Sequence, residues 1–243
     1  MKYVDEPDDR SGKYYFRILL DGVGIDMKDI HGTLIKRFHH VWSHGLVMAT
    51  IFRWLSRLGI TIVPYYLFLE TDNHSNAQNI RPMLDQPYKI MFLNRNNSHL
   101  IKGFKNLSQV ESEFSRLWDT GCSCVCLASE GSILAYGWYD LVTCNYKYLS
   151  FKLNNNEAYS FNYYTARHIR GKNIAAYIRC IIADHLRSLG RNMRYSITEQ
   201  FNTPAIKFAA KRNAQLMRYY VYMNLFNRIR KNILIRILQE CQP

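Results

Sequence analysis

The sequence predicts a mixed α/β fold, with a central β-sheet flanked by helices and an amino-terminal helix and strand added to it. Three observations lead to this prediction. Short aromatic and β-branched runs alternate with apolar-periodic stretches along most of the 243 residues. The run 159–165 reads as a strand that breaks into a basic, glycine-containing turn and continues as a helix. With 48% hydrophobic and 14% aromatic residues, the chain can bury a core, which excludes a disordered protein.

The amino-terminal part is expected to form one helix and one strand. Apolar residues recur at helical spacing over 33–58, with arginines and lysines between them. The segment 60–69 is β-branched and aromatic, which favours a strand. The polar, proline-containing stretch 71–87 is typical of a linker. We therefore divide the chain into an accessory segment, 1–80, and a second domain, 81–243.

The second domain is predicted to alternate strands and helices. Gly121 and Gly190 follow apolar-periodic runs and are natural helix ends, and Glu130-Gly131 is typical of a hairpin turn. The carboxy-terminal tail mixes basic and apolar residues at a spacing that suits an amphipathic helix. In chain order we expect strand 88–93, helix 107–120, strands 122–128, 133–141, 146–153 and 159–165, helix 174–189, strand 194–198, helix 203–211, strand 216–223 and an amphipathic helix over 224–238.

The composition limits the partners and the compartment. The chain carries 32 Lys+Arg against 19 Asp+Glu, formally +13, which predicts attraction to an acidic partner: a nucleotide, a carrier protein, nucleic acid or anionic lipid. The sequence contains no specific nucleic-acid motif. Without a secretory signal peptide, the simplest expectation is a reducing cytoplasm, and no apolar stretch reaches the length of a membrane span.

Three cysteines alternate along the expected strand at 122–128. A strand places Cys122, Cys124 and Cys126 on one face, whereas structural zinc sites usually use ligand pairs with at least two residues between them, on loops that bend round the ion. We therefore expect buried structural thiols and no metal.

The turn after the 159–165 strand has the layout of a phosphate site. It carries Arg167, His168, Arg170, Gly171 and Lys172, and the helix follows at once. The first turn of a helix presents free backbone N–H groups and a partial positive charge, both of which attract an anion. Basic side chains add charge-assisted bonds to phosphate oxygens.

Three features together resemble the GNAT superfamily of acyl-coenzyme A N-acyltransferases, over roughly Tyr88 to Phe226. The segment 170–175, Arg-Gly-Lys-Asn-Ile-Ala, looks like the family's Arg/Gln-x-x-Gly-x-Gly/Ala loop. The segment 202–208, Asn-Thr-Pro-Ala-Ile-Lys-Phe, looks like its Asn-x-x-Ala-x-x-Phe/Leu helix start. The third feature is the order of the elements. One departure is that Asn173 stands where the family has its central glycine.

The resemblance implies that acetyl-CoA or another acyl-CoA is the co-substrate. In the family, the strand before the loop separates from its neighbour and its backbone pairs with the pantetheine arm, while the loop holds the pyrophosphate. Asn202 looks like the residue that binds the pantetheine region, and an Asn at this place also caps a helix well. The implied cofactor-binding residues are Tyr163, Tyr164, Thr165, Ala166, Arg170, Gly171, Lys172, Asn173, Ile174, Ala175 and Asn202.

The catalytic groups are less clearly marked. Many family members place an acidic tyrosine where this chain has Ala209. We take Tyr220 as the candidate acid, with Tyr219 and Tyr222 as alternatives on the same expected strand. Asp140, Glu199 and His168 are candidates for the base, and a route through water stays open. The catalytic residues that we predict are Asp140, Glu199 and Tyr220.

The resemblance implies an enzyme that moves an acetyl or longer acyl group from acyl-CoA to an amine of a small or polymeric acceptor. One alternative is an acidic acyl carrier protein as donor, which a charge of +13 would attract. Another is an inactive module that binds an anionic partner, favoured by Asn173 and Ala209. Three alternatives are open for the expected helix at 33–58: it packs on the sheet, it lies on a membrane surface, or it forms one wall of the acceptor site. Peripheral membrane contact and a homodimer are further open alternatives.

Overall fold

The computed structural model describes residues 46–71, 80–84, 86–103 and 107–238. The expected helix residues 33–45 and most of the linker lie outside these ranges. The elements are α3 (Leu46–Arg57), β1 (Ile60–Thr71), β2 (Lys89–Leu93), η3 (Arg95–Gly103), α4 (Leu107–Asp119), β3 (Ser123–Ser129), β4 (Ser132–Asp140), β5 (Thr143–Tyr146), β6 (Leu149–Lys152), β7 (Glu157–Thr165), η4 (Arg167–Ile169), α5 (Ile174–Ser188), β8 (Met193–Glu199), α6 (Thr203–Lys211), β9 (Gln215–Leu225) and β10 (Ile229–Ile237).

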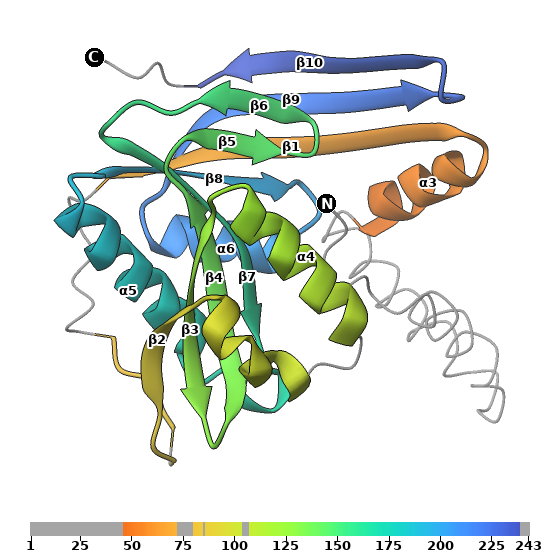
Figure 1. The fold of residues 1–243 in the computed structure, drawn as a ribbon. Helices are drawn as coiled ribbons and strands as arrows, with labels where there is room; N and C mark the ends of the chain where they lie inside the picture. The colour runs from red at the N-terminus through yellow and green to blue at the C-terminus, as the bar shows by residue number, and fades with distance from the viewer. Residues whose placement is uncertain (1–45, 72–79, 85, 104–106, 239–243) are drawn as a thin grey trace, which may run out of the picture.

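Eight of these strands form one mixed sheet in the order β10-β9-β1-β8-β7-β4-β3-β2, which confirms the predicted α/β class. Within it β7 and β8 run parallel, and the other neighbouring pairs are antiparallel. In Figure 1 the strands from β10 to β8 run across the view, and those from β7 to β2 run down it. The sheet therefore changes direction where β7 meets β8.

Successive side chains along β3 and the residue before it belong to two different cores, one on each face of the sheet. Cys122, Cys124 and Cys126 belong to the core that packs against α4, whereas Val125 and Leu127 belong to the core that packs against α5. Successive side chains of a strand point to opposite faces, which explains this division. Burial raises the pKa of the Cys126 thiol to about 12. The cysteines thus lie on one face, and their thiols are buried.

β1 lies in the middle of the sheet, although the resemblance begins only at Tyr88. It pairs with β8 on one side, as in Tyr65↔Glu199, and with β9 on the other, as in Tyr65↔Tyr220. Tyr65 has no exposed surface. The division into 1–80 and 81–243 stays a prediction, but the strand ahead of residue 80 belongs to the same sheet as those after it.

The predicted helix over 224–238 is wrong, because the structure has β10 there. Phe226 (φ 52) and Asn227 (φ 57) both adopt left-handed backbone, the conformation of a tight hairpin turn, and the chain returns along β9. β-branched residues such as Ile229 and Ile233 fit a strand well. The predicted single strand 146–153 is also corrected, because β5 and β6 form a hairpin at that place.

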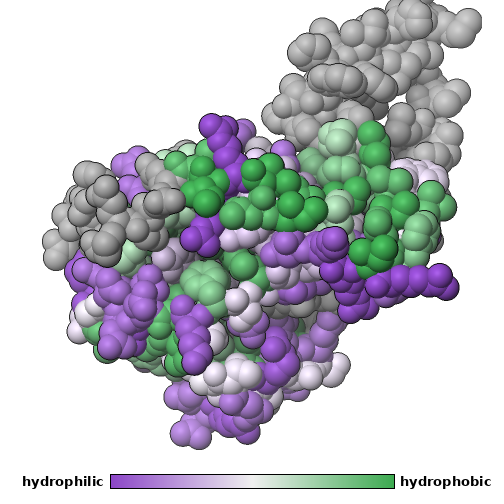
Figure 2. Space-filling model, turned by 90° about the horizontal axis from the view of Figure 1, so that it is seen from above, coloured by the Kyte–Doolittle hydropathy of each residue, from purple (hydrophilic) through white to green (hydrophobic). Residues whose placement is uncertain are grey.

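Apolar side chains remain exposed on β10, on α3 and just after α3. Ile235 is 54% exposed, Trp54 is 60% exposed and Leu58 is 68% exposed. Figure 2 shows apolar groups gathered on the surface seen from above, which is the β10 side of the molecule. Among the described residues, no helix combines the length and apolar character needed to cross a membrane. Membrane or carrier contact through this surface stays a prediction.

Candidate active site

The site begins where β7 and β8 separate. The two strands pair from Glu157↔Met193 to Tyr159↔Tyr195 and no further. β7 then continues beside β4, while β8 continues beside β1. The strands therefore open a wedge whose sides carry backbone groups released from the sheet.

A bulge in β7 accompanies the separation. Trp138 pairs with Phe161 and Tyr136 pairs with Tyr164, so two residues of β7 stand opposite one of β4. Asn162 has φ 49, and a bulge of this kind bends its strand and increases the local twist. The bulge directs the end of β7 away from β8.

Gly137 makes room for this bend. A Cβ at Gly137 would lie 2.5 Å from Cε1 of Tyr163 and 2.7 Å from Cδ1 of Ile182. The Tyr163 ring therefore occupies the space that any side chain at position 137 would need. Packing onto this glycine sets the position of Tyr163 in the wedge.

The wedge holds a cavity of about 840 Å³. Its walls come from β7, β8, the first turn of α5 and the start of α6. The predicted cofactor-binding residues that line it are Tyr163, Thr165, Arg170, Gly171, Asn173, Ile174, Ala175 and Asn202. Tyr164, Ala166 and Lys172 do not line it. Tyr164 instead stacks on Tyr136, at 5.2 Å between ring centroids, and the Ala166 N–H donates to the Leu134 carbonyl at 2.8 Å.

The first turn of α5 forms the open end of this cavity. Asn173, the residue before the helix, has φ 61, a left-handed conformation that Asn tolerates better than most residues, and Gly171 has φ 85. The Asn173 side chain makes no capping hydrogen bond, and its Nδ2 lies 3.9 Å from the sulfur of Met83. The first N–H groups of α5 are therefore not capped by this side chain.

Asn202 lies at the start of α6, where it caps the helix, and its role toward a pantetheine arm stays a prediction. Its Oδ1 accepts a hydrogen bond from the Ala205 N–H at 3.3 Å, which caps the helix. It also lines the cavity opposite the end of β7. The cap fixes the amide side chain at the cavity wall.

The candidate catalytic residues are separated by the fold. Glu199 lines the cavity, and its Oε1 accepts a hydrogen bond from the Tyr146 hydroxyl at 3.2 Å. Asp140 lies elsewhere, where its Oδ1 accepts from the N–H groups of Val142 at 2.7 Å and Thr143 at 3.0 Å. These bonds hold the turn after β4, so this carboxylate has a structural function in the fold.

The tyrosine candidates on β9 point away from the cavity. Tyr220 stacks on Tyr65 with ring centroids 5.3 Å apart, in an aromatic cluster of the core. Tyr222 stacks on Tyr148 at 3.9 Å. The Tyr219 hydroxyl donates to Gln200 Oε1 at 2.9 Å. None of these three tyrosines lines the cavity. His168, the other candidate, is exposed and also does not line it.

Glu113 of α4 was missed by the sequence reasoning and lines the cavity. Its Oε1 accepts a hydrogen bond from the Nδ2 of Asn162, the bulge residue, at 3.3 Å. Burial raises the pKa of the Glu113 carboxyl, and nearby Arg116 partly opposes this shift. One signal could have found it: Glu113 adjoins buried Phe114 on a helix whose other face is exposed.

A second cavity of about 570 Å³ adjoins the first. It lies between α4 and the β5 end of the hairpin and includes Arg116, Asp140 and Thr143. Glu113 and Lys147 line both cavities. Two ligands, one in each cavity, could therefore come together beside Glu113.

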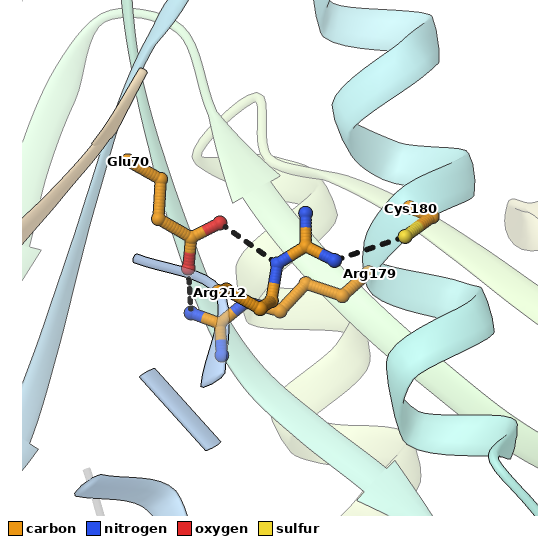
Figure 3. A network of polar contacts seen from close by, with 4 residues as sticks. All are labelled: Glu70, Arg179, Cys180 and Arg212. Carbon is orange, nitrogen blue, oxygen red and sulfur yellow. Dashed lines mark hydrogen bonds and ion pairs between the residues drawn. The ribbon is translucent and has the colours of Figure 1, made fainter. Parts of the chain in front are cut away.

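The closed end of the first cavity is fixed by charged side chains from separate elements. Arg179 of α5 lies 3.2 Å from Glu70 Oε1 of β1, and the Arg212 Nε donates to Glu70 Oε2 at 3.3 Å. Figure 3 shows the Glu70 carboxylate with both guanidinium groups, and Cys180 beside them. The Arg179 guanidinium also lies over the rings of Tyr163, at 4.8 Å, and Phe208, at 5.2 Å.

Solved structures with a similar architecture are known. A tandem GNAT protein from the clavulanic acid biosynthesis pathway, solved without AcCoA, is 12% identical with a TM-score of 0.50, covering 67% of this chain and 53% of that chain. The chain has a GNAT-like fold. GNAT-family proteins from Colwellia psychrerythraea (15% identity, 69% and 58% covered, TM-score 0.49) and Sphaerobacter thermophilus (11%, 78% and 58%, 0.46) are also similar. No protein-family model and no curated protein matches the sequence.

The GNAT-like fold confirms the resemblance at the level of architecture. The matching part of this chain spans 53% to 58% of the length of those three structures. In this fold β7 and β8 are the separating parallel strands, and α5 follows the loop.

Proposed function

We propose that the protein transfers an acyl group from an acyl-CoA to an amine. One observation carries the proposal: the first turn of α5, without a side-chain cap from Asn173, opens onto a cavity of about 840 Å³ between the separated strands β7 and β8. An uncapped helix start attracts an anion, and the released strand edge offers backbone donors and acceptors. Together these features suit a long ligand with a phosphate group at one end.

The pyrophosphate would bind at residues 170–175. Backbone N–H groups of the loop and helix start would surround it, and the positive end of α5 would favour its charge. Arg170, Lys172 and Arg167 supply positive charge at this end of the cavity. The pantetheine arm would then follow the edge of β7, with Asn202 on the facing wall.

In the reaction, the amine nitrogen attacks the thioester carbonyl carbon, the C–N bond forms and the C–S bond breaks. The amine proton passes to the Glu113 carboxylate, and the leaving thiolate stays as thiolate or takes a proton from water. A thiolate with a solution pKa near 8.5 needs little acid assistance, in keeping with Ala209 at the usual tyrosine place. The acceptor would approach through the second cavity, which reaches Glu113.

Calorimetry with acetyl-CoA at low salt tests the binding step. We expect binding that weakens roughly tenfold or more when Arg170→Glu and Lys172→Glu are combined, because like charges then face the phosphates. Lys89→Glu with Lys152→Glu is the matched control, since both residues are exposed and line neither cavity. Absence of binding by acetyl-CoA and by longer acyl-CoA thioesters would overturn the proposal.

Glu113→Gln tests the base. We expect kcat to fall by about 10²–10⁴-fold, with acyl-CoA affinity little changed, because a general base is lost and the side-chain volume is kept. Glu111→Gln is the matched control, an exposed carboxylate on the same helix. Because burial raises the pKa of Glu113, native activity should fall on acidification at a higher pH than an ordinary carboxyl would give. Equal kinetics for the two variants would remove Glu113 from the mechanism.

A further inference from the structure

The closed end of the first cavity is polar, unlike a pocket for a hydrocarbon chain. At the point where β7 and β8 part, a crevice too narrow for a water molecule adjoins the cavity, and Ser160, Tyr163, Arg179 and Ser196 line both. Ser160 and Ser196 are 5% and 6% exposed. An acyl group that reaches this end would meet hydroxyl groups and a guanidinium group.

This end also carries more positive than negative charge among its paired groups. Glu70 is the one carboxylate that contacts Arg179 or Arg212 within the described residues, so two guanidinium groups share one carboxylate. The three side chains are 5% to 13% exposed. A buried charge is costly unless an opposite charge compensates it. The trio therefore favours one further anion nearby.

Arg179 has donors left for such an anion. A guanidinium group carries five N–H donors, and Glu70 is the polar partner of Arg179 in the part of the chain described here. The rings of Tyr163 and Phe208 hold the guanidinium plane from its faces, which leaves its edge for hydrogen bonds. A carboxylate matches that edge with two parallel bonds.

Two buried hydroxyl groups complete this end. Apart from each other, Ser160 Oγ and the Tyr163 hydroxyl have no hydrogen-bond partner among the described residues. Buried polar groups in native proteins are normally paired. Both hydroxyls can donate to a carboxylate oxygen, so the same ligand group would satisfy them and compensate the guanidinium charge.

We infer that the acyl group carried by the donor is short and ends in a carboxylate, which binds to Arg179 and the hydroxyls of Ser160 and Tyr163. This inference rests on the proposed function and adds the class of donor: the coenzyme A monothioester of a dicarboxylic acid. Arg179 acts here as a specificity residue, because it contacts the far end of the acyl group and not the reacting carbonyl.

Calorimetry with succinyl-CoA and butyryl-CoA tests the inference, because the two acyl groups have the same number of carbons and differ in the terminal carboxylate. We expect the native protein to bind succinyl-CoA about tenfold to a hundredfold more tightly, the effect of a well-placed charged hydrogen bond. Comparable affinities for the two thioesters would overturn the inference and leave the proposed function standing. Binding of neither thioester, nor of acetyl-CoA, would overturn the proposed function itself.

Arg179→Met should bring the succinyl-to-butyryl affinity ratio close to one while acetyl-CoA affinity changes little. Lys207→Met is the matched control, since it removes an exposed positive charge on α6 that lines neither cavity. A ratio retained in Arg179→Met would show that the carboxylate is bound elsewhere and would overturn the assignment.

Two further variants test the inference if Arg179→Met does not fold, and Tyr163→Phe is the milder of the two. Tyr163→Phe removes one hydroxyl and should lower the ratio about threefold to tenfold. Glu70→Gln removes a competing carboxylate and should raise the affinity for succinyl-CoA but not for butyryl-CoA. A purely structural network would leave the ratio unchanged in both variants, and that result would contradict the inference.

Discussion

The two ends of the main cavity are built from different parts of the chain. The open end uses backbone N–H groups. It requires of the sequence only residues that can adopt positive φ, as Gly171 and Asn173 do. The closed end uses side chains from separate elements: Glu70 from β1, Tyr163 from β7 and Arg179 from α5. A backbone site can therefore be recognised from one short segment, whereas a side-chain site exists only once the sheet has assembled.

Removing the central carboxylate should give the largest effect. In Glu70→Ala the guanidinium groups of Arg179 and Arg212 lose their shared partner while staying buried, a situation that typically costs about 3–5 kcal/mol of folding free energy. Urea unfolding followed by circular dichroism measures it. Glu111→Ala, an exposed carboxylate on α4, is the control. A loss below about 1 kcal/mol would mean that the closed end does not depend on its charges.

Gly137→Ala should give an intermediate effect at the closed end. The new methyl group would overlap the Tyr163 ring and Ile182, and overpacking of this kind costs about 1–3 kcal/mol. Gly190→Ala separates the steric from the backbone contribution, because its new Cβ meets open space while φ is 75. We expect a loss of about 1 kcal/mol there. Equal losses in thermal unfolding would contradict the packing explanation.

Changes at Asn173 should give the smallest effect, because the open end depends on backbone. Asn173→Gly keeps the left-handed conformation without strain and removes a side chain from the cavity wall. Acetyl-CoA should then bind a few-fold more tightly, with stability within about 1 kcal/mol of native. Asn173→Ala should lose about 1 kcal/mol, since Ala disfavours this conformation. Weaker acetyl-CoA binding by Asn173→Gly, measured by calorimetry, would show that the side chain itself contacts the ligand.

The elements around the open end could be predicted because their signals are local. Gly121 and Gly190 end α4 and α5 where expected, and both have positive φ. Asn202 caps α6 as its type and position suggest. The turn before α5 needs only its own residues to be recognised.

The parts that were not predicted depend on distant contacts. The apolar spacing of residues 224–238 suits a helix and a strand alike, and pairing with β9 decides for the strand. The sequence of β1 itself does not indicate that this strand pairs with β8 on one side and β9 on the other. Glu113 and Arg179 acquire their surroundings from Asn162 and Glu70, which lie far away along the chain.

The central place of β1 also has a consequence for how the chain folds. β1 is synthesised before both of its neighbours, because its ladders join Tyr65 to Glu199 and to Tyr220. During synthesis its apolar residues, Leu67 and Leu69 among them, have no neighbouring strand to pack beside until β8 and β9 have left the ribosome. Pairing over such long separations in sequence makes folding slow. A strand that stays unpaired for this long raises the risk of aggregation during synthesis.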